Sequence, residues 1–249
     1  MARIFAGTSG FAYPNWKPAF YPSNLPARRF LEHYAERLGC VEINYTFRRL
    51  PAAATLQSWV AATPAGFQFA VKAHMRITHI FRLKDAGAAT ETFLRAIDPL
   101  RIAGRLGPIL FQLPPQMRSD VPLLSRFLSE LPPGPRYAFE FRHDSWLNRE
   151  VYDALARHNI SLCVAESERL EVPEVITADF VYFRLRQPEY SEGDLRSIAG
   201  HGGELTAKGL DAYLIFKHED TPQGALYAER VQKLLGAPKG TVRRRRSTG

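Results

Sequence analysis

The sequence predicts an α/β protein with the TIM (β/α)8-barrel fold, formed as a single domain with parallel strands and outer helices. Short apolar segments that alternate with period two are each followed by a segment with apolar residues at helical spacing. This order recurs about eight times along the 249 residues, without an internal repeat or a flexible linker. Strands that alternate with helices pair in parallel, and a series of this length favours a closed barrel.

The first strand is predicted at residues 3–7, and it ends in the turn Gly-Thr-Ser-Gly. An open doubly wound sheet is the alternative fold, and it would usually place a glycine-rich phosphate-binding turn here. Neither G-x-G-x-x-G nor G-x-x-x-x-G-K-[ST] is present. The turn is followed instead by an aromatic loop that packs on the barrel rim, forms one wall of a pocket, or does both: Phe11, Tyr13, Trp16, Phe20 and Tyr21.

Helix boundaries follow from capping residues and apolar spacing. Pro26 suits a first helical turn and Gly39 a position just after the last, so a helix is predicted between them. Ser119 and Asn148 can cap two further helices, the second of which runs to His158. The other helices are predicted at residues 54–62, 88–101, 191–199 and 223–235, whereas residues 167–179 are too irregular to form one.

The fifth strand shows the alternation most clearly. Tyr137, Phe139 and Phe141 form one aromatic face, whereas Glu140 and Arg142 lie on the other. An aromatic face of this kind must be buried, while the other face ends in a carboxylate and a guanidinium. The remaining strands are predicted at residues 40–44, 67–72, 108–113, 160–165, 180–186 and 212–217.

The net charge of +8 is concentrated at the C-terminus. Lys239 and Arg243–Arg246 add five positive charges with no acidic residue after position 236, so that +8 less 5 leaves +3 for the rest. We therefore expect a folded domain over residues 1–236 and a basic, disordered tail over residues 237–249. The tail is interpreted as a solvated terminus, in preference to an electrostatic tether to RNA or DNA.

The composition indicates a cytoplasmic protein without a membrane segment. No run of about 18 apolar residues is present, and the N-terminal apolar stretch is too short for a signal peptide. Cys40 and Cys163 fall in different predicted strands, which favours reduced thiols over a disulfide.

Polar side chains gather at the predicted carboxyl ends of the strands. If the large apolar residues face the helices, the alternate positions point to the barrel axis. Carboxyl strand ends are where barrel enzymes hold their active sites, so we predict one site there. The alternative is a buried ion-pair network that only fills the barrel, but so many charges are costly to desolvate. Lys217 or His218 can join the inward set, which is Thr8, Glu42, Asn44, Lys72, Gln112, Glu140, Arg142 and Arg184.

These residue types predict a mildly cationic pocket. Lys72, Arg142 and Arg184 outnumber the two carboxylates, and arginine binds phosphate or carboxylate in bidentate fashion. Glu42 and Glu140 are the candidate catalytic acid and base, if their surroundings separate their pKa values. Asn44, Gln112 and Thr8 are then ligand-binding residues. The sequence identifies no cofactor and leaves open whether the protein is an enzyme.

Histidines and tryptophans add further candidates. His79 lies near Arg76, Arg82 and Lys84 in the loop after the third strand and is assigned to ligand binding, whereas His74 is interpreted as structural. Trp16 and Trp146 lie in loops at the rim and can stack on a base or sugar, whereas Trp59 belongs to the core.

No residue is assigned as a metal ligand. Neither H-x-H nor H-E-x-x-H occurs in the sequence. A metal would need a set such as Glu140, Glu166, His143 and His218, and the nearby cations oppose this.

Several motifs together resemble the YecE-like family, known as domain of unknown function 72, over residues 3–235. They are G-T-S-G-F-A-Y-P-N-W at 7–16, F-Y-P at 20–22, V-E-I-N-Y-T-F at 41–47, F-A-V-K-A at 69–73, I-T-H-I-F-R-L at 77–83, G-P-I-L-F-Q-L-P-P at 107–115 and Y-A-F-E-F-R-H-D-S-W at 137–146. The resemblance implies a TIM barrel in a bacterial or archaeal cytoplasmic protein, and it implies no particular reaction. A distant likeness of the family to barrel nucleases and sugar isomerases suggests metal-dependent or nucleic-acid chemistry by analogy alone.

The chain departs from the family pattern at two strand ends. The sixth strand ends at Glu166, where the family usually has aspartate. The eighth strand ends F-K-H-E-D at residues 216–220, where the family usually has F-N-N-D. These changes add charge near the predicted pocket.

Three functional hypotheses follow from the sequence. The first is an enzyme or binding protein for a small anionic ligand, either a phosphate or a carboxylate, at the strand ends. The second is a nucleic-acid-binding, nuclease-like barrel that uses the pocket rim and the basic tail, with or without a metal. The third is a scaffold whose site has lost its activity.

Overall fold

The structure is a computed structural model that describes residues 1–218 and 220–236, and it is a closed barrel of eight parallel strands in sequence order. β1 pairs with both β2 and β8, which closes the ring. The predicted single-domain TIM barrel is therefore confirmed. The strands are β1 (Ile4–Ser9), β2 (Cys40–Ile43), β3 (Gln68–Lys72), β4 (Leu106–Gln112), β5 (Tyr137–Glu140), β6 (Ser161–Ala165), β7 (Phe180–Leu185) and β8 (Asp211–Phe216).

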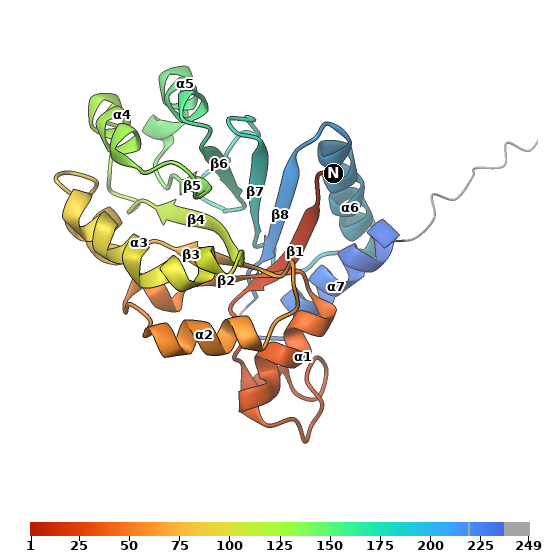
Figure 1. Ribbon diagram of the computed structural model, residues 1–249. Helices are drawn as coiled ribbons and strands as arrows, with labels where there is room; N and C mark the ends of the chain where they lie inside the picture. The colour runs from red at the N-terminus through yellow and green to blue at the C-terminus, as the bar shows by residue number, and fades with distance from the viewer. Residues whose placement is uncertain (219, 237–249) are drawn as a thin grey trace, which may run out of the picture.

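The helices lie outside the ring of strands (Figure 1). They are α1 (Phe30–Arg37), α2 (Ala53–Ala61), α3 (Gly87–Ile102), α4 (Val121–Glu130), α5 (Arg149–Arg157), α6 (Glu192–Ala207) and α7 (Gln223–Gly236). No helix connects β6 to β7 within the described chain, as the sequence indicated. That connection is an irregular loop, which leaves the carboxyl end of β6 and returns to the start of β7.

Two helix ends differ from the predictions. Asp120, and not Ser119, caps α4, because its carboxylate accepts a hydrogen bond from the Leu123 N–H. α6 continues to Ala207 although glycines follow residue 199. Gly202 lies against Ile4, where an added Cβ would approach within 3.1 Å of the Ile4 side chain. The glycine therefore permits close packing of helix on strand, and this contact outweighs its low helix propensity.

Apolar side chains form two layers, one outside the strands and one inside the barrel. The outer layer holds the aromatic face of β5, as predicted, together with the inner faces of the helices. The inner layer includes Phe5, which stacks on Tyr213 at 4.7 Å. Cys40 and Cys163 belong to the same inner layer and are unpaired, which confirms the predicted free thiols.

The aromatic loop after β1 packs against α1. Tyr21 stacks on Phe30 at 4.2 Å, and Trp16 packs against both Phe20 and Tyr21. Trp16 is 0% exposed, so it is withdrawn from any ligand. The prediction that Trp16 can stack on a base or sugar is therefore wrong, and the loop packs beside the barrel, which was one of the two expectations for it.

No helix in the described part of the chain is long and apolar enough to cross a bilayer. The basic tail predicted over residues 237–249 lies outside the described residues.

Candidate functional site

Glu140 is the centre of a charged cluster at the carboxyl ends of the strands. It is the last residue of β5, it points into the barrel, and it is fully buried. Its Oε2 accepts a hydrogen bond from Arg184 Nη1 at 2.5 Å. Its Oε1 accepts from Arg142 Nη1 at 2.6 Å and from Arg186 Nη2 at 3.2 Å. One carboxylate thus holds three guanidinium groups.

Glu42 supports the same cluster from β2. Its Oε1 accepts from Arg184 Nη2 at 2.7 Å and from Ser9 Oγ at 3.1 Å, and its Oε2 accepts from the Tyr182 hydroxyl at 2.9 Å. Asn44 donates through Nδ2 to Ser9 Oγ. Arg184 therefore bridges two buried carboxylates, and its side chain is only 1% exposed.

A second arm of the cluster runs from Glu140 to Lys72. Gln112 donates through Nε2 to Glu140 Oε1 at 2.8 Å. Its Oε1 then accepts from Lys72 Nζ at 2.5 Å. The Lys72 ammonium also lies 4.1 Å from the centre of the Phe47 ring. The His79 ring meets Phe47 in a T-shaped contact, with ring centres 4.9 Å apart.

The cluster shifts the pKa values of its members in opposite directions. Burial alone would raise the pKa of Glu140, but the guanidinium groups of Arg184, Arg186 and Arg142 hold it well below its usual range. Burial, with the charge of Arg184, lowers the pKa of Lys72 to about 8, against the opposing charges of the carboxylates. Glu140 is therefore a carboxylate at neutral pH, whereas Lys72, with a pKa of about 8, titrates slightly above neutrality.

A cavity of about 900 Å³ opens beside the cluster, between the ends of β6 and β7 and the irregular loop that joins them. Arg142 and Arg186 line this cavity together with Glu166. Arg142 is one-third exposed, and Arg186 Nε is buried with no hydrogen-bond partner among the residues that the structure describes. The two arginines thus belong both to the cluster and to the cavity wall.

The structure brings together seven of the predicted site residues, which are linked by the hydrogen bonds above: Glu42, Asn44, Lys72, Gln112, Glu140, Arg142 and Arg184. His79 lies at the edge of this set, in contact with Phe47. Burial, with the charges of Lys72 and Arg82, lowers its pKa.

The structure contradicts the placement of Thr8 in the site. Its hydroxyl contacts the hydroxyl of Tyr34 on α1, at 2.9 Å, so Thr8 faces the helix layer. The neighbouring Ser9 points inward instead. The prediction assigned the wrong face of β1 to the barrel interior, because it assumed that the large aromatic Phe5 faces the helices. Phe5 instead lies inside the barrel and stacks on Tyr213.

Trp146 also lies outside the site. Its ring is 0% exposed and stacks on Phe141 at 4.9 Å, and its Nε1 donates to the Met117 carbonyl at 2.7 Å. With its polar atom satisfied and both faces enclosed, it is a structural residue of the loop after β5, and it cannot stack on a ligand.

Four further residues of the site were not among the predicted set. Ser9 was missed because the wrong face of β1 was assigned to the barrel interior. Tyr182 and Arg186 lie two residues before and after Arg184, so the period-two alternation of β7 places them on the same inward face. Glu166 accepts hydrogen bonds from the Arg186 and Gln187 N–H groups and from the Tyr190 hydroxyl. It therefore holds the segment after β7 in place.

The residues considered for a metal are dispersed among other partners. Glu140 binds guanidinium groups, Glu166 binds the segment after β7, and His218 Nε2 contacts the Gln187 carbonyl at 2.7 Å. Among the described residues, no group of three or more His, Cys, Asp or Glu side chains is arranged to hold a metal ion.

Lys217, which the sequence placed as a possible member of the inward set, lies near enough to Lys72 to lower its pKa by charge repulsion.

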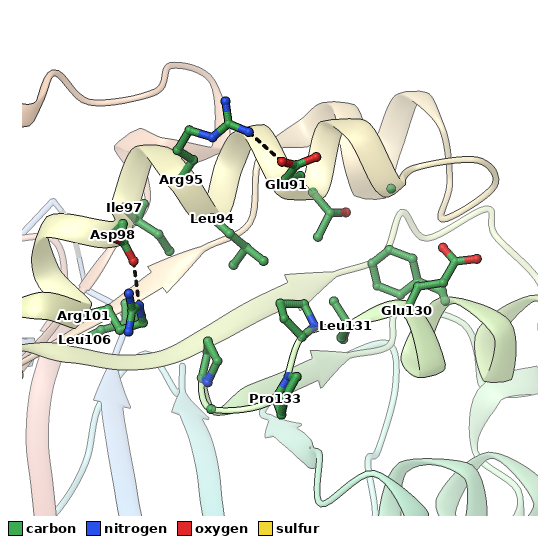
Figure 2. Close-up of a pocket in the computed structure, with 16 residues that line it drawn as sticks. Glu91, Leu94, Arg95, Ile97, Asp98, Arg101, Leu106, Glu130, Leu131 and Pro133 are labelled. Carbon is green, nitrogen blue, oxygen red and sulfur yellow. Dashed lines mark hydrogen bonds and ion pairs between the residues drawn. The ribbon is translucent and has the colours of Figure 1, made fainter.

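A separate cavity of about 620 Å³ lies between α3 and α4, outside the barrel (Figure 2). Its walls include Leu94, Ile97, Leu106 and Leu131, and ion pairs of 2.6 Å join Glu91 to Arg95 and Asp98 to Arg101 along α3. None of the cluster residues lines it. This cavity is therefore separate from the charged cluster at the carboxyl ends of the strands.

Fold and site together define a TIM-barrel protein with a buried, cation-rich cluster at the carboxyl ends of its strands. The chain belongs to the family described as "Protein of unknown function DUF72", whose pattern matches residues 5–248. This confirms the resemblance seen in the motifs.

Known relatives agree with this assignment. The UPF0759 protein YunF of Bacillus subtilis (strain 168) is 26% identical over 157 residues, and the match spans 60% of this chain and 54% of YunF, about half its length. The crystal structure of a DUF72 family protein from Thermotoga maritima MSB8 has a TM-score of 0.82 and 28% identity, and the match covers 94% of this chain and all of that one. A DUF72 family protein from Enterococcus faecalis V583 shares the fold at 17% identity, with a TM-score of 0.76 and coverage of 96% and 99%.

Proposed function

We propose that this protein binds a small ligand carrying a phosphate or carboxylate group at the carboxyl end of the barrel. The cluster sets Lys72, Arg142, Arg184 and Arg186 against Glu42 and Glu140, four cations against two carboxylates. An anion would neutralise the excess of positive charge. Partial burial strengthens such charge-assisted hydrogen bonds relative to those in water.

The observation that carries this proposal is the arrangement of Arg142. Its Nη1 donates to Glu140, while its Nη2 and Nε make no hydrogen bond within the described residues. The same side chain lines the 900 Å³ cavity. A guanidinium oriented by a carboxylate on one side and open on the other is a suitable receptor for an oxyanion.

In this proposal the two carboxylates position the cations and do not react. Glu42 and Glu140 are both 0% exposed, and each of their oxygens already accepts at least one hydrogen bond. The low pKa of Glu140 leaves it without a proton to donate at neutral pH. The acid–base role expected from the sequence therefore does not suit Glu140.

We expect Arg142→Met to abolish phosphate binding with little loss of stability. Glu140 keeps Arg184, Arg186 and Gln112 as partners in the variant, so its buried charge remains compensated. Thermal melts measured across a phosphate titration should show a rising melting temperature for the parent and none for the variant, because a ligand stabilises the state it binds.

The matched control is Arg149→Met, which removes an arginine whose side chain is 91% exposed on α5. It should keep the phosphate-dependent shift. A large loss of stability in Arg142→Met, together with no phosphate-dependent shift in the parent, would show that Arg142 is a structural residue and would refute the proposal.

Nucleic-acid binding is the second candidate, and one surface favours it. Tyr45 and Phe81 are 49% and 36% exposed in the loops after β2 and β3, and the Arg76 guanidinium lies 5.7 Å from the centre of the Phe81 ring. Arg48 and Arg82 are exposed in the same two loops. Aromatic rings among arginines suit stacking and phosphate contacts on a single strand.

Salt-dependent binding of a fluorescent single-stranded oligonucleotide, retained after removal of residues 237–249, would favour this second function. It should weaken in Arg76→Ala and persist in Arg142→Met. Saturable phosphate binding that depends on Arg142, without oligonucleotide binding, would favour the first.

A further inference from the structure

We propose that Lys72 is a nucleophile that forms an imine with the carbonyl group of an anionic aldehyde, ketone or 2-oxo acid bound at the cluster. This inference rests on the proposed anion site and names the ligand class that the site would take. It gives Lys72 a covalent role in addition to its charge.

The position of Lys72 suits this role. It is the last residue of β3, on the inner face at the carboxyl end of the barrel, and it is only half-buried. A chain of hydrogen bonds connects it to Arg142, from Lys72 to Gln112 to Glu140 to Arg142. The inferred ligand would place its anionic group at Arg142 and its carbonyl group at Lys72.

Gln112 orients the amine for attack. Because Gln112 Nε2 donates to Glu140, its Oε1 must face Lys72 and can only accept. A neutral amine donates one N–H to that oxygen and keeps its lone pair. The fixed amide thus holds Nζ in place without consuming the electron pair that attacks a carbonyl carbon.

The surroundings also favour a neutral amine close to physiological pH. Burial and the positive charges of Arg184 and Lys217 lower the pKa of Lys72 to about 8, whereas Glu140 and Glu42 act in the opposite direction. The Phe47 ring, which faces the ammonium, also favours the charged form. Desolvation beside other cations is a general way of activating a lysine for Schiff-base chemistry.

The step balances without an oxidant or reductant. The neutral Nζ attacks the carbonyl carbon, a C–N bond forms, and the carbonyl oxygen takes up the proton lost from nitrogen to give a carbinolamine. Loss of the hydroxyl group with one further proton releases water and leaves the imine. Hydrolysis by water reverses both steps, so the covalent bond to the ligand is reversible.

The test traps the imine on the whole protein. Pyridoxal 5′-phosphate serves as the phosphate-bearing aldehyde, glyoxylate as the carboxylate-bearing aldehyde, and propanal as the neutral aldehyde. Cyanoborohydride delivers a hydride to the imine carbon and gives a stable secondary amine, which peptide mass spectrometry assigns among the seven lysines. We expect Lys72 to be labelled by the anionic aldehydes about tenfold or more faster than exposed Lys84, because a larger fraction of its amine is neutral near pH 8.

Three comparisons complete the test. Lys84→Arg should leave the labelling of Lys72 unchanged, and inorganic phosphate should slow it. Arg142→Met should slow labelling by the two anionic aldehydes but not by propanal. The preference between pyridoxal 5′-phosphate and glyoxylate distinguishes a phosphate-bearing from a carboxylate-bearing ligand.

Labelling of the exposed lysines at the same rate as Lys72, or of all lysines except Lys72, would overturn the inference. The failure of the proposed function is distinguishable from this result. If phosphate raises the melting temperature of the parent while Lys72 is not labelled, the anion site stands and the nucleophile is wrong. If Lys72 is labelled rapidly by propanal alone, without protection by phosphate, the nucleophile stands and the anion site is wrong.

Discussion

Replacing Glu140 with glutamine is expected to lower the free energy of unfolding by about 3–5 kcal/mol, as is usual when one partner of a buried ion pair is removed. The carboxylate holds Arg184, Arg142 and Arg186 at distances of 2.5, 2.6 and 3.2 Å. Glutamine keeps the shape but removes the charge, and its amide nitrogen cannot accept a hydrogen bond. Arg184 is buried with it, so one guanidinium cannot turn to water. Urea unfolding of parent and variant at pH 7 measures the loss.

The pH dependence identifies the charge as the cause. The folded pKa of Glu140 lies below its ordinary value of 4.5, so its contribution to stability is fully present above about pH 4.5 and is lost as the pH falls below it. The difference in stability between parent and Glu140→Gln should therefore be constant from pH 6 to 8, an interval chosen well above the unfolded pKa, and should shrink below pH 4.5. A difference that is equally large in strong acid would mean that packing, and not charge, is lost.

Glu192→Gln is the matched control for burial. Glu192 also pairs with two arginines, Arg196 and Arg230, but its side chain is 46% exposed on α6. Water replaces the lost partner there, so the midpoint of unfolding should change little. A loss as large as that in Glu140→Gln would contradict the view that burial makes the cluster costly to disturb.

The second large effect is expected for Gly7→Ala, which should prevent or severely weaken closure of the barrel. A Cβ at this position would lie 1.9 Å from the Cys40 carbonyl oxygen and 2.9 Å from its Sγ. Gly7 pairs with Cys40 across β1 and β2, and the same strand pairs with β8. The backbone must move apart at the point where the ring closes, so the cost should reach or exceed the upper end of the about 1–3 kcal/mol typical of overpacking.

Gly203→Ala provides the control, because a Cβ there would meet nothing within 4 Å on α6. Alanine has the higher helix propensity, so this variant should be as stable as the parent or slightly more so. Circular dichroism melts of both variants decide the prediction. If Gly7→Ala had the same melting temperature as the parent, the strands would tolerate separation at this point.

The fold could be predicted from the sequence because its signals are local. The alternation of Phe139 with Glu140 and the helical spacing around Phe30 each depend on residues close in the chain, and the order of elements implies parallel strands. The predictions failed at positions where a contact with a residue distant in the chain determines the local structure. α6 passes through its glycines because Gly202 packs against Ile4, which lies almost two hundred positions earlier.

Most residues of the cluster could be predicted for the same reason, whereas the residue that β1 contributes could not. Period-two alternation placed Lys72, Glu140 and Arg184 on the inner face without any knowledge of their neighbours. For β1 the assignment depended on where an aromatic residue points, and Phe5 lies inside because Tyr213 on β8 provides a surface to stack on. That partner is known only once the ring is closed.

The sequence by itself determined the barrel, the two free thiols and the convergence of charged residues at the strand ends, because each follows from chain-local periodicity combined with the geometry of parallel strands. Only the tertiary structure decided which atoms pair. It made Ser9, and not Thr8, the neighbour of Glu42, enclosed Trp146 in the packed loops, and set three guanidinium groups on one carboxylate. Burial and charge act through space, so the pKa values of Glu140 and Lys72 depend on residues from strands that the chain order leaves far apart.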